Sequence, residues 1–169
     1  MDIKLLALDV DGVLTDGTIL YTSNGEDIKA FHAHDGLGLK LLNKLGVEIA
    51  VISGRQSAPL TKRLDDLGIY HRRLNCKDKV AALEDICDEL GITLKGVAFM
   101  GDDLVDLAAM QASAYAIAPA NAVLEVQAAA DWVSDVCGGQ GAVRDVCEHL
   151  AEKMGTSLSA ALSGAKVVQ

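Results

Sequence analysis

Short, nearly continuous apolar runs alternate with amphipathic stretches along this chain, and this alternation constrains the fold more than any other feature. The runs lie at residues 3–8, 47–53, 96–101 and 114–118. Such runs are typical of strands that are buried on both faces of a parallel sheet. Strands that alternate with helical segments favour an α/β domain. We therefore predict a doubly wound, Rossmann-like parallel sheet with helices on both faces.

Helix boundary signals fall between the apolar runs. Asp35 is placed to cap a helix that closes at Gly46, and Asp78 to cap one that stops at Gly91. Pro59 suits the first turn of a helix between these two. The remaining elements are expected as strands within 68–74 and 131–133, and as helices at 104–113, 121–130 and 141–154.

Residues 17–31 interrupt the alternation, because their pattern predicts a β-hairpin. Two strand-like segments flank Ser23-Asn24-Gly25-Glu26, and Asn-Gly is a strong turn signal. Two roles stay open from the sequence. The hairpin either forms an ordinary edge of the sheet, or it protrudes and closes a site or packs against a partner.

The length and composition indicate one domain of ordinary globular type. A chain of 169 residues, half of them apolar, can bury a substantial core. We expect a single domain over residues 1–154. The segment 155–169 is rich in small residues and weakly patterned, so we expect a flexible tail there.

Charge and cysteine usage exclude several functional classes. The net charge of −9 argues against nucleic acid or an anionic membrane as a partner. No stretch approaches ~18 consecutive apolar residues, so no membrane span is expected. Asp9 interrupts the first apolar run, which argues against a signal peptide. The four cysteines lack zinc-like spacing and indicate free thiols in a reducing cytoplasm.

Polar and charged side chains gather at the ends of the predicted strands. Ligands of doubly wound sheets bind outside the carboxyl ends of the strands, so these side chains are the candidate site. In chain order they are Asp9 with Asp11, Ser53 with Gly54 and Arg55, Lys79, and Asp102 with Asp103. Each group alone is common in turns and helix caps. Their conjunction at four strand ends is much more specific.

The residue types in this conjunction fit a metal ion and a phosphate group. Asp9, Asp11 and Asp102 offer oxygen ligands, which suit Mg²⁺. The cation would offset the cost of placing carboxylates close together at the end of a buried strand. Ser53 and Lys79 suit phosphate oxygens, one as a hydroxyl donor and one as a point charge.

The motifs DVDGVLTDG (residues 9–17) and GDDLVD (residues 101–106), with Ser53 and Lys79 between them, resemble the four motifs of the haloacid dehalogenase-like phosphotransferases. The resemblance implies that Asp9 is the nucleophile, which forms an aspartyl-phosphate. Asp11 would be the general acid and base.

The same resemblance implies how cofactor and phosphate are held. Mg²⁺ would be bound by the carboxylates of Asp9 and Asp102 and by the backbone carbonyl of Asp11. Ser53 and Lys79 would hold the phosphoryl group through its transition state. Supporting roles fall to Thr15, Asp103 and Asp106.

A closer resemblance covers residues 3 to about 154 and includes the run GGQGAVRDVC at 138–147. This part of the chain is similar to the family of 3-deoxy-D-manno-octulosonate 8-phosphate (KDO 8-phosphate) phosphatases. The resemblance implies hydrolysis of KDO 8-phosphate, a step in making the inner sugar of lipopolysaccharide. It also implies a homotetramer in which a neighbouring subunit covers each active site. Arg63 resembles a substrate-binding arginine supplied across that interface.

Spacing independently argues against a separate cap domain. Asp9 and Ser53 are 44 positions apart, and Ser53 and Lys79 are 26 apart. These intervals hold only the elements of the fold itself and the hairpin. Phosphoryl transfer gains from exclusion of water, so the hairpin is the segment most suited to closing the site.

Some positions depart from the family pattern and keep other functions open. His34 stands where the family has an arginine, and Leu37 replaces an aromatic residue. The alternative enzyme is a phosphatase of nonulosonate 9-phosphates, which are of the sialic acid type. An alternative of another class is an inactive module for binding or oligomerisation. The intact set of aspartates, serine and lysine argues against this alternative.

Further basic side chains are candidates for substrate or metal contacts. His32 and His34 share a face in a strand, as a metal pair would, but packing in the hairpin or at an interface is the favoured interpretation. Arginine can bind a sugar carboxylate through two hydrogen bonds. The candidates are Arg55, Arg63, Arg72 and Arg73, with Arg144 expected to orient the last helix or contact phosphate.

Overall fold

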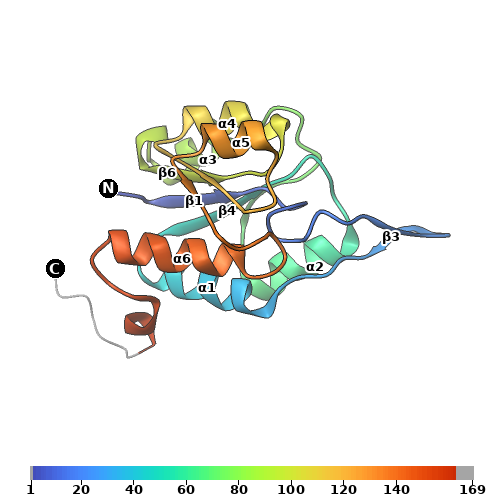
Figure 1. The fold of residues 1–169 in the computed structure, drawn as a ribbon, viewed down its shortest axis with the longest axis horizontal. Coiled ribbons are helices and arrows are strands. Elements are labelled where there is room, and N and C mark those ends of the chain that lie inside the picture. The colour runs from blue at the N-terminus through green and yellow to red at the C-terminus, as the bar shows by residue number, and fades with distance from the viewer. Residues whose placement is uncertain (1, 163–169) are drawn as a thin grey trace.

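A six-stranded parallel sheet forms the centre of the molecule in the computed structural model (Figure 1), which describes residues 2–162 without the side chains of Glu26 and Asp27. The strand order is β5-β4-β1-β6-β7-β8, and every neighbouring pair is parallel. The strands are β1 (Leu5–Leu8), β4 (Glu48–Ile52), β5 (His71–Arg73), β6 (Val97–Met100), β7 (Tyr115–Ala118) and β8 (Trp132–Val133). The predicted α/β class is therefore confirmed.

Helices cover both faces of the sheet, as Figure 1 shows. One face carries α1 (Ala33–Lys44), α2 (Ala58–Leu67) and α6 (Ala142–Lys153), and the other carries α3 (Lys79–Leu90), α4 (Leu107–Ala112) and α5 (Leu124–Ala129). Alternation along β1 explains this arrangement: Leu6 and Leu8 pack into one hydrophobic cluster, and Leu5 and Ala7 into the other. Short 3₁₀ turns lie at Leu94–Gly96, Leu104–Asp106 and Leu158–Ala161.

Strand register brings the predicted site residues to one level. Leu8 is paired with Val51 of β4 and with Met100 of β6. The backbone N–H of Asp9 donates to the carbonyl of Met100 at 3.0 Å, which extends the pairing by one residue. The residues that follow β1, β4 and β6 therefore emerge side by side at the carboxyl edge of the sheet.

The hairpin forms a small sheet of its own. Strands β2 (Leu20–Thr22) and β3 (Gly25–Ile28) pair antiparallel, and in Figure 1 they extend away from the layered body. At the turn, the hydroxyl of Thr22 donates to the carbonyl of Gly25 at 3.1 Å. Three apolar side chains of the hairpin are largely exposed: Leu20, Tyr21 and Ile28.

The prediction that Asp35 caps its own helix is wrong. Helix α1 begins at Ala33, so Asp35 lies in its first turn. Its buried carboxylate accepts a hydrogen bond of 2.8 Å from the backbone N–H of Arg144, in the first turn of α6. Gly141, at the N-cap of α6, has no side chain to supply that acceptor. Asp35 therefore caps the neighbouring helix α6 and not α1, the helix to which it belongs.

The packed part of the chain continues past residue 154. Leu158 is buried in the same cluster as α1 and α6. Residues 163–169, which make up the rest of the expected tail, lie outside the described residues. All four cysteines are free thiols. Within residues 2–162, no helix has the length and apolar character needed to cross a membrane.

Candidate active site

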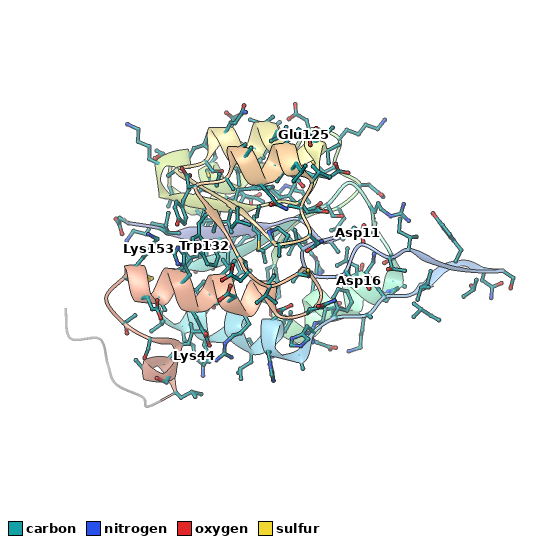
Figure 2. The ribbon with its side chains drawn as sticks, in the orientation of Figure 1. Asp11, Asp16, Lys44, Glu125, Trp132 and Lys153 are labelled. Carbon is teal, nitrogen blue, oxygen red and sulfur yellow. The ribbon has the colours of Figure 1, made fainter. Side chains whose placement is uncertain are left out.

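A cavity of about 530 Å³ opens at the carboxyl edge of the sheet, between the strand ends and the base of the hairpin. Figure 2 shows Asp11 at this end of the molecule and Lys153 and Trp132 toward the other. The predicted site residues that line the cavity are Asp9, Asp11, Ser53, Gly54, Arg55, Lys79, Asp102 and Asp103. Its other lining residues are Gly17, Ile19, Cys76, Lys77 and Val105.

Lys79 joins two buried carboxylates beneath the cavity. It is the first residue of α3, whose N-cap Asp78 accepts from two backbone N–H groups. Its Nζ lies 3.0 Å from Oδ1 of Asp9 and 2.6 Å from Oδ1 of Asp106. Burial alone would lower the pKa of Lys79, but attraction to the two carboxylates outweighs it and raises that pKa. The ammonium group therefore stays charged.

The carboxylate of Asp106 connects Lys79 to the loop that carries Asp102. The other oxygen of its fully buried carboxylate, Oδ2, accepts from the backbone N–H groups of Asp102 and Asp103, at 3.0 and 3.2 Å. Gly101 leaves room for this carboxylate, since a Cβ there would lie 2.3 Å from Cβ of Asp106. Both oxygens of Asp106 are thus occupied by protein donors, and the loop that carries Asp102 is fixed.

The carboxylates of Asp9 and Asp102 are poised for a cation. Burial, reinforced by the charge of Asp106 and opposed by Lys79, raises the pKa of Asp9 to about 6. Burial together with the charges of Asp9 and Asp106 raises the pKa of Asp102 to about 7. Oδ1 of Asp102 is buried without a hydrogen-bond partner. A positive charge between the two carboxylates would relieve both the repulsion and the unpaired oxygen.

Carboxylate oxygens of Asp9, Asp102 and Asp106 lie within 4.8 Å of one another, and this is the one such cluster among the side chains that the structure describes. Because both oxygens of Asp106 are already bonded, Asp9 and Asp102 are the carboxylates with capacity left for a metal. An all-oxygen donor set of this kind suits a hard divalent cation such as Mg²⁺. His32 and His34 stand outside the cluster and pack edge to face, with ring centroids 5.0 Å apart.

The loop after β1 packs closely against Asp102 and is held by hydrogen bonds to its backbone N–H groups. Gly12 has a φ of +88°, and a Cβ there would lie 1.9 Å from Oδ2 of Asp102. The hydroxyl of Thr15 accepts from the backbone N–H groups of Gly12 and Gly17, at 3.4 and 3.2 Å. Thr15 therefore supports the loop without lining the cavity.

A segment from the C-terminal part of the chain holds the same loop from outside. The side-chain amide of Asn121 donates to the carbonyl of Gly12 at 3.0 Å and accepts from the backbone N–H of Gly138 at 2.6 Å. A Cβ at Gly138 would lie 1.9 Å from the carbonyl oxygen of Gly12. Glycine at position 138 thus permits direct backbone packing against the loop.

Ser53 lies at the end of β4, where its backbone bonds to both neighbouring segments. Its N–H donates to the carbonyl of Arg73 at 2.9 Å, and its carbonyl accepts from the N–H of Cys76 at 3.0 Å. Its hydroxyl accepts from the backbone N–H of Arg55 at 3.2 Å. The hydroxyl proton remains available to a ligand in the cavity.

The sequence analysis missed one residue at this site, Lys29. Its Nζ lies 2.5 Å from Oδ1 of Asp11, and Nε of Arg55 lies 3.6 Å from Oδ2 of the same carboxylate. Lys29 follows β3 and belongs to no motif, and its side chain meets Asp11 through the path that the chain takes after the hairpin. No pattern in the sequence signals this contact.

The other arginine candidates are engaged elsewhere. Arg63 is absent from the cavity lining; its guanidinium donates to the carbonyl of His32 at 3.1 Å and lies over the ring of Phe31. The remaining three form ion pairs away from the cavity: Arg72 with Asp65, Arg73 with Glu89, and Arg144 with Glu148. Within one chain, Arg55 is the arginine of the candidate set at the cavity.

The parallel sheet, the aspartates at the ends of β1 and β6, and the lysine at the start of α3 define a haloacid dehalogenase-like hydrolase. The family model described in these words matches residues 73–143. The KDO 8-phosphate phosphatase of Haemophilus influenzae is 42% identical over 156 residues, which cover 92% of this chain and 87% of that protein. The chain belongs to the family of 3-deoxy-D-manno-octulosonate 8-phosphate phosphatases.

Solved structures agree with this assignment. The phosphatase of Moraxella catarrhalis, in complex with a magnesium ion, a phosphate ion and KDO, matches with a TM-score of 0.90 and 40% identity, over 97% of this chain and 94% of that chain. The cobalt-bound enzyme of H. influenzae matches with a TM-score of 0.89 and 42% identity, over 91% and 90% of the two chains.

Proposed function

We propose that this protein is a Mg²⁺-dependent phosphatase that hydrolyses KDO 8-phosphate to KDO and inorganic phosphate, a step in the synthesis of lipopolysaccharide precursors. The observation that carries the proposal is the pair of carboxylates at the cavity. Asp9 is held 3.0 Å from the ammonium of Lys79, and Asp102 beside it has a buried oxygen without a partner. Family membership supplies the substrate class.

In the first half-reaction, a carboxylate oxygen of Asp9 attacks the phosphorus atom of the substrate. The bond between phosphorus and the sugar oxygen breaks, and its electron pair stays on that oxygen. Asp11 donates a proton to the leaving oxygen, so the sugar departs as a neutral alcohol. The products of this step are the free sugar acid and an aspartyl-phosphate at Asp9.

In the second half-reaction, Asp11 accepts a proton from a water molecule as that water attacks the aspartyl-phosphate. The bond between phosphorus and the Asp9 oxygen breaks, which regenerates the carboxylate and releases inorganic phosphate. Asp11 regains the proton that it gave away, so the cycle consumes one water and no other reactant.

Charge stabilisation comes from the groups around the phosphoryl oxygens. Asp9 and Asp102, with the backbone carbonyl of Asp11, would hold Mg²⁺, which would supply positive charge for the phosphoryl oxygens when bound. Lys79 orients Asp9 and adds a second positive charge, and the hydroxyl of Ser53 donates to a phosphoryl oxygen. Gly54 and Arg55 extend the same wall of the cavity.

The test of this proposal is a phosphate-release screen over sugar acid phosphates, with kcat/KM compared between KDO 8-phosphate and nonulosonate 9-phosphates. We expect KDO 8-phosphate to be favoured by at least ~10-fold. Asp9→Asn should lower kcat by ~10³-fold or more and keep the fold. A preference for a nonulosonate 9-phosphate would move the assignment to that enzyme. If phosphate were released from none of the sugar acid phosphates, the remaining assignment would be the inactive module for binding or oligomerisation.

We propose further that the active site has no cap domain of its own and is covered by a neighbour in a homotetramer. The exposed apolar side chains of the hairpin, among them Leu20, Tyr21 and Ile28, support an interface there. In such an assembly Arg63 of one subunit would reach the cavity of the next. Light scattering should show a tetramer, and a fully active monomer would contradict coverage by a neighbour.

A further inference from the structure

The side chain of Lys29 is almost completely buried, although lysine is seldom buried without a purpose. Only 3% of the side chain is exposed, and its Nζ lies 2.5 Å from Oδ1 of Asp11. Burying an ammonium group is costly unless a partner compensates for its lost hydration. One carboxylate that compensates for it here, that of Asp11, lines the catalytic cavity.

The other oxygen of Asp11 faces a second cation. Nε of Arg55 lies 3.6 Å from Oδ2, and Nη2 of Arg55 donates to the hydroxyl of Tyr21 at 3.3 Å. Tyr21 belongs to β2, and Lys29 directly follows β3. The two oxygens of Asp11 are therefore linked to both arms of the hairpin, one directly and one through Arg55.

This arrangement bears on proton transfer, because a general acid must lie within hydrogen-bond reach of the leaving oxygen. Asp11 has two rotatable side-chain bonds, and its side chain is 19% exposed and lines the cavity. A carboxylate at an open cavity would otherwise sample several rotamers. A misplacement of ~1 Å can cost ~10²-fold in rate.

We propose that Lys29 is a positioning residue that holds the Asp11 carboxylate in the orientation needed for proton transfer, so that the base of the hairpin is part of the catalytic apparatus. The inference rests on the proposed function for the role of Asp11. It assigns the hairpin a task inside its own subunit, in addition to any contact with a neighbour.

A double-mutant cycle separates positioning from a merely structural tie. The variants are Lys29→Met, Asp11→Asn and the two combined, with Lys29→Arg as the conservative variant. We expect Lys29→Met to lower kcat on KDO 8-phosphate by ~10- to 10²-fold, with KM changed less than ~3-fold. Lys29→Arg should recover most of the loss. In the Asp11→Asn background, Lys29→Met should change kcat less than ~2-fold, because no acid remains to be positioned.

Lys62→Met is the matched control, since Lys62 forms an ion pair with Asp66 on the surface and its side chain is 72% exposed. It should leave kcat and KM unchanged. An equal loss from Lys29→Met in both backgrounds, or a loss carried by KM alone, would overturn the positioning role.

The substrate assignment can be refuted independently of the role of Lys29. If the wild-type protein ignores KDO 8-phosphate but hydrolyses another phosphate monoester, such as p-nitrophenyl phosphate, that result refutes the substrate alone. The same cycle on the substrate that is turned over then decides the role of Lys29. A wild-type protein without activity on any phosphate monoester would overturn both proposals.

Discussion

Replacing Lys79 by methionine tests how the charges beneath the cavity are balanced. The substitution keeps a similar length but removes the ammonium that lies between Asp9 and Asp106. Both carboxylates are buried, so neither can recover the lost partner from solvent. Removing one member of such a network costs ~3–5 kcal/mol, a large part of the ~5–15 kcal/mol that stabilises a typical domain.

The loss should depend on pH in a defined direction. Even with Lys79 opposing it, burial raises the pKa of Asp9 from 3.8 to about 6. Without Lys79 this pKa rises further, and each unit corresponds to ~1.4 kcal/mol. The folded state then binds more protons than the unfolded state above pH ~4, so stability falls as the pH rises through the folded pKa. We expect a loss of ~3–5 kcal/mol at pH 8 and about half of it at pH 5, where the carboxyl of Asp9 is neutral.

The assay is urea unfolding with EDTA present, at pH 5 and pH 8, on the wild type and the variant. Lys62→Met serves as the control and should change the free energy of unfolding by less than ~0.5 kcal/mol. The same destabilisation by Lys79→Met at both pH values would refute the reasoning, because it would show that packing and not charge is what Lys79 supplies.

Three further predictions follow from the site and the helix interface. Gly12→Ala should destabilise the protein by ~1–3 kcal/mol, because position 12 has a φ of +88°. It should also weaken Mg²⁺ binding, measured by calorimetry, because the new Cβ displaces Asp102. An unaltered Mg²⁺ affinity would contradict the placement of Asp102 at the metal site. Burial raises the pKa of Asp102 to about 7, so the metal-free protein should lose stability as the pH rises from 4 to 8. Mg²⁺ should therefore raise the Tm more at pH 8 than at pH 6. An equal rise at both pH values would argue against cation binding by this carboxylate. Asp35→Ala should cost ~1–2 kcal/mol in urea unfolding, because it removes the acceptor for the N–H of Arg144; an unchanged stability would mean that water replaces the cap.

The sequence was sufficient to predict the site wherever the parallel topology itself places the residue. Asp9, Ser53 and Asp102 follow strands that pair in register, so their proximity follows from knowing that the sheet is parallel. The start of α3 was also predictable, because Asp78 caps it within its own turn. In both cases a local pattern determines the position.

The sequence was insufficient where a side chain acts across elements. Asp35 carries an ordinary cap signal, but its carboxylate is used by a helix 109 positions away. Lys29 meets Asp11 through the path of the hairpin, which no periodicity reports. Arg63 matched a family position, yet within one chain it packs on Phe31 away from the cavity. Such contacts depend on tertiary packing, which composition and spacing do not encode.

The contact of Asn121 with Gly12 has a consequence for the order in which the protein forms. It joins residues 109 positions apart, and Gly138 completes it from still later in the chain. Closing so long a loop is slow, because chain entropy is lost before the contact is gained. During synthesis the loop that carries Asp9 and Asp11 is made first, but the support from Asn121 and Gly138 comes much later. A nascent chain that ends before Gly138 can hold most of the sheet but lacks the contact that completes the support of this loop, so a finished catalytic loop requires the chain to extend past Gly138.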